Sequence, residues 1–151
     1  VTEAIWDKIL DTNLKGAFFC AQAVAKRMAA GGSIINLCSL TTEVGIPTAV
    51  PYGSSKTGLL GMTRALAAEW APLGIRVNAI APSLTATPLA ASLTNNPTVA
   101  EAIANLHPIP RLGTADDIAA LACFLLSHDS SWLTGQILHV DGGRSTLRPK
   151  G

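Results

Sequence analysis

Charged residues and long apolar runs are both scarce in this chain, and each shortage excludes a class of protein. Charged residues make up 14% of its 151 residues and leave a formal net charge of +1. No excess of positive charge therefore draws it to nucleic acid or to an anionic lipid surface. No uninterrupted apolar run reaches the length that crosses a membrane, and no signal peptide opens the chain. We expect neither a nucleic-acid partner nor a membrane partner.

Cysteine and histidine are too few and too scattered for a disulfide framework or a metal site. The three cysteines are widely spaced and flanked by apolar residues: Cys20, Cys38 and Cys123. Such residues are typical of small core hydrophobes in a reduced, cytoplasmic protein. The three histidines show no ligand spacing and are interpreted as structural or surface residues: His107, His128 and His139. The sequence therefore predicts no metal site.

Apolar residues are abundant, at 48% of the chain, and they follow two periodicities. Their spacing is helical over 3–29, from Tyr52 to about Ala71, and from about Thr114 to Ser127. Short apolar runs typical of buried strands lie at 34–38, 75–81 and 136–140.

Local signals mark where two further helical segments begin. Thr87 followed by Pro88 is a good N-cap and first helical residue, and it opens an irregular helical segment that ends before Pro108. Thr114, with Asp117 three residues later, resembles a capping box at the start of the next helix.

Two glycines, Gly58 and Gly61, interrupt the predicted helix over 52–71. A glycine inside a helix costs about 1 kcal/mol relative to alanine. We therefore expect another backbone to pack closely against the helix at these positions.

The alternation of helices and strands indicates an α/β fold with a parallel sheet. In such a sheet, ligands bind beyond the carboxyl ends of the strands. Three loops fall at those ends: the loop that begins at Ser39, the segment from Pro82 to Thr87, and Asp141-Gly142-Gly143. We expect these loops to converge on one edge of the sheet.

The only tyrosine of the chain lies after the first of these loops. Tyr52 and Lys56 are one turn apart on the same face of the predicted helix. An ammonium beside a phenol favours the ionised phenol, which is the direction needed for proton transfer near neutral pH. Ser39 could hydrogen-bond the same substrate oxygen. The pattern indicates a carbonyl/alcohol redox site, although a Tyr-x-x-x-Lys pair taken alone can also be a chance surface pair.

Longer stretches carry a family resemblance. They are NLKGAFFCAQAV, SIINLCSL, YGSSKTGLLGMTRALAAEWAPLGIRVNAIAP, PRLGTADDIAALACFLLS and TGQILHVDGG. They span nearly the whole chain, and the chain resembles the C-terminal part of a short-chain dehydrogenase/reductase. The resemblance implies a Rossmann-like, doubly wound parallel sheet. Residues 1–151 would be its C-terminal portion, a single domain of three strands with flanking helices.

The resemblance implies catalytic roles residue by residue. Tyr52 would be the general acid/base, and Lys56 would favour its ionised form and hydrogen-bond the nicotinamide ribose. Ser39 would hold and polarise the substrate oxygen. Asn13 matches a helix asparagine that helps to hold a water-linked proton relay to the lysine, although by itself it is an ordinary polar helix residue.

The resemblance also implies a cofactor loop. Cofactor contacts would come from Tyr52, Lys56, Pro82, Ser83, Leu84, Thr85 and Thr87. The backbone around Leu84 and Thr85 would face the nicotinamide carboxamide, with Thr87 near the amide or the pyrophosphate. Ser83 stands where glycine is usual in the family, and it adds a Cβ where the backbone approaches the cofactor closely.

Several parts of the family pattern have no counterpart in the 151 residues. They are the glycine-rich phosphate loop, the residue that chooses between NAD and NADP, and the Asn-Asn-Ala-Gly segment. Val1 already stands at a helix start, and three strand–helix units, about 90 residues, would precede it. We therefore expect a fragment that lacks the N-terminal nucleotide-binding half and is inactive alone. The choice between NAD and NADP stays open.

The leading hypothesis is an NAD(P)-dependent oxidoreductase that interconverts a secondary alcohol and a ketone. Two alternatives stay open: a truncated or degenerate non-catalytic assembly module, and epimerase or dehydratase chemistry. Retention of the Ser-Tyr-Lys set argues against the first, and the short ending after DGG argues against the second. A largely apolar pocket wall over 40–50 favours a neutral or lipophilic carbonyl substrate. The resemblance implies a homotetramer or homodimer, assembled through the helices over 3–29 and 52–71.

Overall fold

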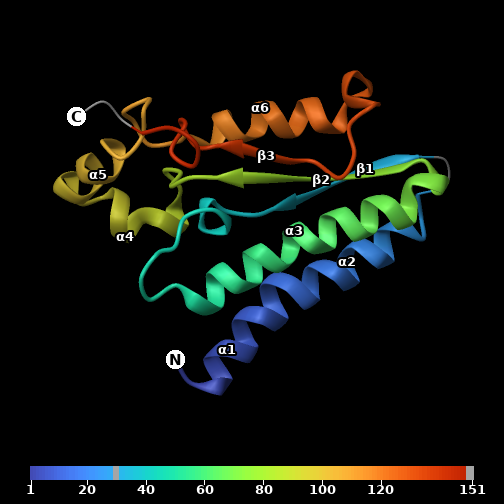
Figure 1. Cartoon of the computed structure of the whole chain (residues 1–151), viewed down its shortest axis with the longest axis horizontal. Coiled ribbons are helices and arrows are strands. Elements are labelled where there is room, and N and C mark those ends of the chain that lie inside the picture. The colour runs from blue at the N-terminus through green and yellow to red at the C-terminus, as the bar shows by residue number, and fades with distance from the viewer. Residues whose placement is uncertain (29–30, 149–151) are drawn as a thin grey trace.

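The predicted strands pair side by side in one parallel sheet. The computed structural model describes residues 1–28 and 31–148, and within these the sheet has the order β1-β2-β3. The strands are β1 (Gly32–Leu37), β2 (Ile75–Pro82) and β3 (Ile137–Val140). Leu37 pairs with Ile80, and Pro82 pairs with Val140, so the carboxyl ends of the strands lie at the same edge (Figure 1). The α/β prediction is confirmed.

Helices cover both faces of this sheet, as a doubly wound fold requires. The elements α1 (Glu3–Leu10), α2 (Gly16–Ala25) and α3 (Val50–Trp70) lie on one side, and α6 (Ala115–Leu126) lies on the other (Figure 1). Short 3₁₀ turns link them: η2 (Leu40–Thr42), η3 (Ala71–Leu73) and η5 (His128–Ser130). The central strand carries the core, since Val77, Ala79, Ile80 and Ala81 are fully buried.

The first predicted helix is interrupted in its middle. A five-residue π-helical turn, η1 (Asp11–Lys15), separates α1 from α2, and α2 ends at Ala25. The expected end at residue 29 lies outside the described residues. A π turn carries one residue more than an α turn, and such turns are frequent at functional sites. Asn13 lies at the centre of this one.

The first strand is less buried than its apolar sequence predicts. Most of β1 is only half-buried, and the Leu37 side chain is 55% exposed. The reason is its place in the sheet. In the described part of the chain β1 pairs with β2 alone, so its other edge is open.

The expected irregular helical segment after Thr87 is confirmed. The segment divides into η4 (Pro88–Ala90), α4 (Ala91–Thr94) and α5 (Pro97–Ala104). Thr87 occupies the N-cap position of η4, but its side chain makes no capping bond. Proline disfavours helical geometry in the residue before it. Asn96 is accordingly extended, and it caps α5 by accepting a hydrogen bond from the Val99 N–H at 3.3 Å.

The remaining helix predictions are confirmed. α3 begins two residues before Tyr52, and Gly74 ends the following turn with a left-handed φ of 72°. The capping box of α6 is present, with Thr114 and Asp117 bonding each other's backbone N–H groups. No helix among the described residues combines the length and the apolar character that a membrane span needs.

Candidate active site

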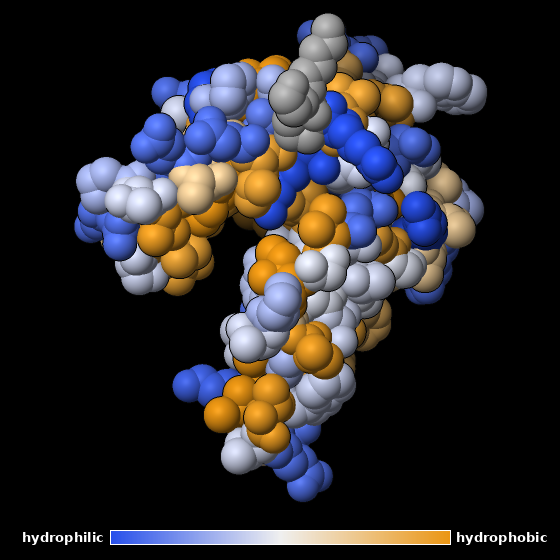
Figure 2. All heavy atoms as spheres, turned by 60° about the vertical axis from the view of Figure 1, so that its left-hand side comes forward, coloured by the Kyte–Doolittle hydropathy of each residue, from blue (hydrophilic) through white to orange (hydrophobic). Residues whose placement is uncertain are grey.

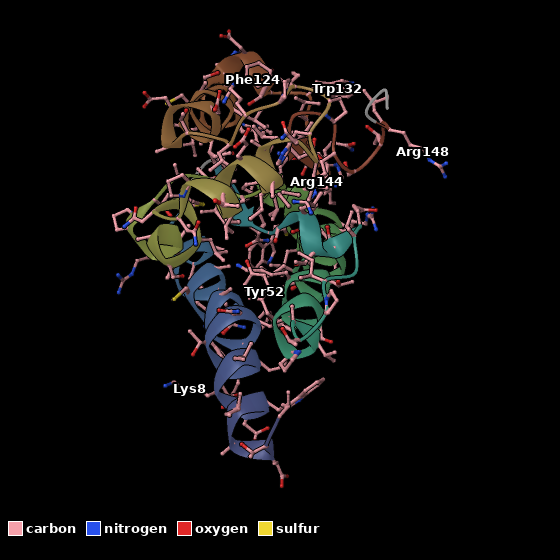
Figure 3. The ribbon with its side chains drawn as sticks, turned by 90° about the vertical axis from the view of Figure 1, so that its left-hand side faces the viewer. Lys8, Tyr52, Phe124, Trp132, Arg144 and Arg148 are labelled. Atoms are coloured by element: carbon pink, nitrogen blue, oxygen red, sulfur yellow. The ribbon has the colours of Figure 1, made fainter. Side chains whose placement is uncertain are left out.

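Tyr52 and Lys56 lie together on the first turns of α3. The Lys56 Nζ is 5.8 Å from the centroid of the Tyr52 ring. The Tyr52 side chain is exposed, and in the view of Figure 3 its label lies between the ribbons of α2 and α3. The structure thus brings a phenol and an ammonium into one site, one helical turn apart.

The Lys56 side chain is fixed rather than free. Its Nζ donates a 2.7 Å hydrogen bond to the Leu37 carbonyl at the end of β1. Burial lowers the pKa of Lys56, and the neighbouring Cys38 acts weakly in the opposite direction. Burial also raises the pKa of Cys38 to about 11, so that residue is a neutral thiol at physiological pH. Lys56 is the basic side chain beside Tyr52.

Ser39 begins the turn that follows β1. Its Oγ accepts a hydrogen bond from the Thr41 N–H at 3.2 Å and opens η2. This turn packs against the start of α3. A Cβ placed on Gly53, the residue after Tyr52, would lie 3.7 Å from the Thr41 carbonyl oxygen. The turn that carries Ser39 therefore adjoins the turn that carries Tyr52.

Asn13 reaches the same helix through a serine that the sequence reasoning missed. Asn13 Nδ2 donates to Ser55 Oγ at 3.1 Å, and the Ser55 hydroxyl donates to the Tyr52 carbonyl at 2.7 Å. Ser55 is fully buried. Its position three residues after Tyr52 is the signal that could have indicated this contact, because serine hydroxyls in helices often bond the carbonyl one turn back. The π turn is thus connected to the backbone of Tyr52 through the Ser55 hydroxyl.

Asn13 and Lys56 also line one hollow. It has a volume of about 530 Å³ and runs along β1, between that strand and the residues of η1 and α2. The predicted relay residue and the predicted catalytic lysine are therefore on the same cavity, although they are 43 positions apart in the sequence.

The segment 82–87, here called the β2 loop, crosses the carboxyl edge of the sheet. The Ser83 N–H donates to the Val140 carbonyl at 3.2 Å. Gly113 donates its N–H to the Leu84 carbonyl and accepts from the Ala86 N–H, at 3.0 and 2.9 Å. The loop is held on two sides by its backbone.

The third predicted loop, Asp141-Gly142-Gly143, is held by hydrogen bonds of its own turn and by one bond to Ile109. The Asp141 carboxylate accepts hydrogen bonds from the N–H groups of Gly143 and Ser145, both at 2.9 Å. Gly142 accepts from the Ile109 N–H at 3.1 Å. Asp141 therefore closes its own turn, and its role in the described structure is to shape the edge of the sheet.

Ser83 does not point at the tyrosine. Its hydroxyl lies 2.8 Å from the Nε2 of His107, a ring that is 3% exposed. The interpretation of His107 as a structural residue holds, but its contact with the β2 loop was not visible in the sequence. The Cβ at this unusual serine is accommodated because the side chain turns toward His107.

Known proteins resemble this chain over nearly its whole length. A family model described as enoyl-(acyl carrier protein) reductase matches residues 1–145. The chain is 40% identical over 143 residues to an NAD-dependent glycerol dehydrogenase of Listeria innocua, which covers 93% of this chain and 56% of that protein. It thus spans little more than half the length of this relative.

Solved structures show the same likeness. A protein of Sinorhizobium meliloti described as a short-chain alcohol dehydrogenase is 53% identical, with a TM-score of 0.89 over 95% of this chain and 58% of that one. A gluconate 5-dehydrogenase of Burkholderia cenocepacia, solved with NADP and tartrate, is 34% identical, with a TM-score of 0.92 over 97% of this chain and 58% of that one. The chain belongs to the short-chain dehydrogenase/reductase family.

Proposed function

We propose that the full-length protein is an NAD(P)-dependent oxidoreductase that interconverts a secondary alcohol and a ketone. One observation carries the proposal: the Lys56 ammonium, anchored on the Leu37 carbonyl, lies 5.8 Å from the Tyr52 ring at the carboxyl edge of the sheet. A phenol held beside a basic side chain can give a proton to a substrate oxygen or take one from it.

The site fits a nicotinamide dinucleotide. In the β2 loop the N–H of Thr85 donates to no acceptor among the described residues, so it can donate to a carboxamide oxygen. The residues that would hold the cofactor are Tyr52, Lys56, Pro82, Ser83, Leu84, Thr85 and Thr87. When bound, the nicotinamide supplies or accepts a hydride at its C4 carbon. One relative is named as NAD-dependent, and another was solved with NADP, so both cofactors are candidates.

The side chains then divide the proton chemistry among them. Tyr52 gives its phenolic proton to the carbonyl oxygen during reduction and takes it back during oxidation. Ser39 donates a hydrogen bond to the same oxygen and holds it near Tyr52. Lys56 holds its amino group beside the Tyr52 ring, and Asn13 supports the helix of Tyr52 through Ser55.

The side chains of the segment before Tyr52 favour a neutral or lipophilic carbonyl substrate. Ile46, in the loop before α3, and Val50, the first residue of α3, are apolar and exposed. Glu43 lies in the same loop, with its carboxylate 3.5 Å from the His139 Nε2, so it is engaged within the protein. Figure 2 shows a hollow on one side of the molecule, with hydrophobic residues along its walls. A preference for a strongly anionic carbonyl over a neutral one would contradict this part of the proposal.

Tyr52→Phe tests the proposal in the full-length protein. The substitution keeps the ring but removes the proton donor, so turnover should fall by about a hundredfold or more. Binding of NADH or NADPH, measured by fluorescence titration, should be unchanged. Ser54→Ala is the matched control, because it removes an exposed hydroxyl two residues away on α3 and should leave turnover intact. Turnover of the Tyr52 variant within tenfold of wild type would refute the assigned role.

We further propose a homotetramer or homodimer. Large apolar side chains are exposed on α1 and α2: Ile5, Trp6, Phe19 and Val24. Helix faces of this kind are typical of subunit interfaces. Sedimentation of the full-length protein at micromolar concentration should give a mass of two or four subunits, and a monomer would contradict the proposal.

A further inference from the structure

A buried hydrogen bond joins the β2 loop to the far end of the segment that follows it. That segment, residues 88–106, is here called the arm, and it comprises η4, α4 and α5. The bond lies between Ser83 Oγ and His107 Nε2, at 2.8 Å. Ser83 is 9% exposed and His107 is 3% exposed, so water does not compete for either group.

The hydrogen bonds of the His107 ring indicate which tautomer the neutral ring adopts. Its Nδ1 lies 2.9 Å from the Ile103 carbonyl and 3.2 Å from the Ala104 carbonyl. Carbonyl oxygens only accept hydrogen bonds, so Nδ1 carries the proton. Nε2 of the neutral ring is then the acceptor, and the Ser83 hydroxyl donates to it. The ring is bonded to the end of α5 on one side and to the β2 loop on the other.

This bond and the nearby backbone bond from the Ile109 N–H to the Gly142 carbonyl hold the far end of the arm. Its helices pack mainly on each other, α4 against η4 and α5. Its first residue is joined covalently to Thr87, at the end of the β2 loop. In Figure 1, α4 and α5 extend beyond the carboxyl ends of the strands. His107 returns the end of the arm to the loop from which the arm departs.

The neighbouring turn is built to admit the ring. Gly142 has a left-handed φ of 61°, and a Cβ there would lie 3.3 Å from the His107 Cβ. With glycine at position 83, the buried Nε2 of His107 would lose its donor, and a buried polar atom without a partner is unfavourable. Ser83 and His107 are therefore a matched pair.

We infer that His107 is a positioning residue that locks the arm to the β2 loop through Ser83. Under the proposed function, on which this inference rests, the β2 loop faces the nicotinamide and the arm borders the substrate. The hydrogen bond then holds the cofactor side and the substrate side of the site in one fixed relation. Breaking the hydrogen bond by a substitution at either Ser83 or His107 should loosen both the β2 loop and the arm.

Limited proteolysis of the full-length protein tests the lock without reference to activity. Leu89 and Leu93 are exposed on the arm, at 96% and 45%, and are cleavable by chymotrypsin. Ser83→Ala removes only the hydroxyl, and His107→Phe keeps a ring but removes both nitrogens. Each should raise the cleavage rate of the arm by about five- to tenfold, the equivalent of one hydrogen bond. The double variant should exceed neither single variant, because both break the same bond.

Cofactor titration completes the test. Each single variant should weaken NADH or NADPH binding by about five- to tenfold. For the alcohol that wild type oxidises, His107→Phe should raise KM for the cofactor while kcat at saturating cofactor stays within about twofold, because Tyr52 and Lys56 are untouched. The inference is overturned if Ser83→Ala leaves both arm cleavage and cofactor binding at wild-type values. It is also overturned if the effects of the two substitutions on the cleavage rate multiply in the double variant. If wild type binds no dinucleotide, the proposed function fails, and the cleavage data still decide whether the lock exists.

Discussion

Two alanine substitutions on α3, Gly58→Ala and Gly61→Ala, place the same methyl group in different surroundings. A Cβ at Gly58 would lie 2.7 Å from the Cδ2 of Leu14, closer than real contacts of this kind. A Cβ at Gly61 would meet no atom within 4 Å. The expectation that both glycines serve close packing is therefore met at Gly58, by a side chain rather than a backbone, and not met at Gly61.

The two variants should differ in stability by about 1–3 kcal/mol. Gly61→Ala gains helix propensity without a clash, so it should raise the free energy of unfolding by about 1 kcal/mol. For a chain of this size that corresponds to a rise in Tm of about 2–4 °C. Gly58→Ala gains the same propensity, but overpacking against Leu14 costs about 1–3 kcal/mol. Its stability should therefore equal that of wild type or fall below it.

Urea unfolding of the full-length variants, at one fixed protein concentration, measures this difference. Turnover provides a second readout, because Leu14 is next to Asn13 in the π turn. Displacing Leu14 should lower turnover in Gly58→Ala, while Gly61→Ala should keep it. Equal stability gains in the two variants would refute the packing argument. A loss of stability in Gly61→Ala would refute the open space assigned to that position, and would be expected if a second subunit packs there.

Two further predictions concern titratable groups. At pH 8, iodoacetamide should label the exposed Cys20 and Cys123 of the native protein but leave Cys38 unmodified. Burial raises the pKa of Cys38 to about 11, and the thiolate is the reactive form. Mass spectrometry that finds Cys38 labelled as fast as the other two cysteines would contradict this prediction. Hydrogen bonds from Arg111 and the capping-box backbone hold the pKa of Asp117 well below its usual range. Its contribution to stability is therefore present above about pH 4, the range of an unfolded aspartate, and is lost as the pH falls toward the depressed folded value. Asp117→Asn should lower the urea midpoint at pH 7 and converge with wild type in acid; a difference that persists unchanged at pH 2 would be evidence against it.

Much of the fold could be predicted because local patterns were strong and consistent. The apolar runs of β2 and β3 and the capping box of α6 depend on residues a few positions apart. The arm was predicted to be an irregular helical segment, and its interruption before Pro97 follows from the effect of proline on the residue before it. The half-exposed β1 was missed because a strand's apolar sequence does not record how many neighbours it has.

The candidate site divides in the same way. Tyr52 and Lys56 were predictable because one helical turn relates them. Ser55 and His107 were not, because their contacts depend on groups 42 and 24 positions away. No periodicity indicates which buried serine faces which distant amide or ring.

The sequence by itself determined the parallel α/β architecture, the placing of three loops at one edge, and the pairing of a tyrosine with a lysine. All of these follow from spacing along the chain. Only the tertiary structure decided that a π turn aligns Asn13 with the helix of Tyr52, that Lys56 rests on the Leu37 carbonyl, and that Ser83 faces His107. These contacts form between segments that meet only when the sheet and its helices pack, so their partners are set by three-dimensional register rather than by local sequence.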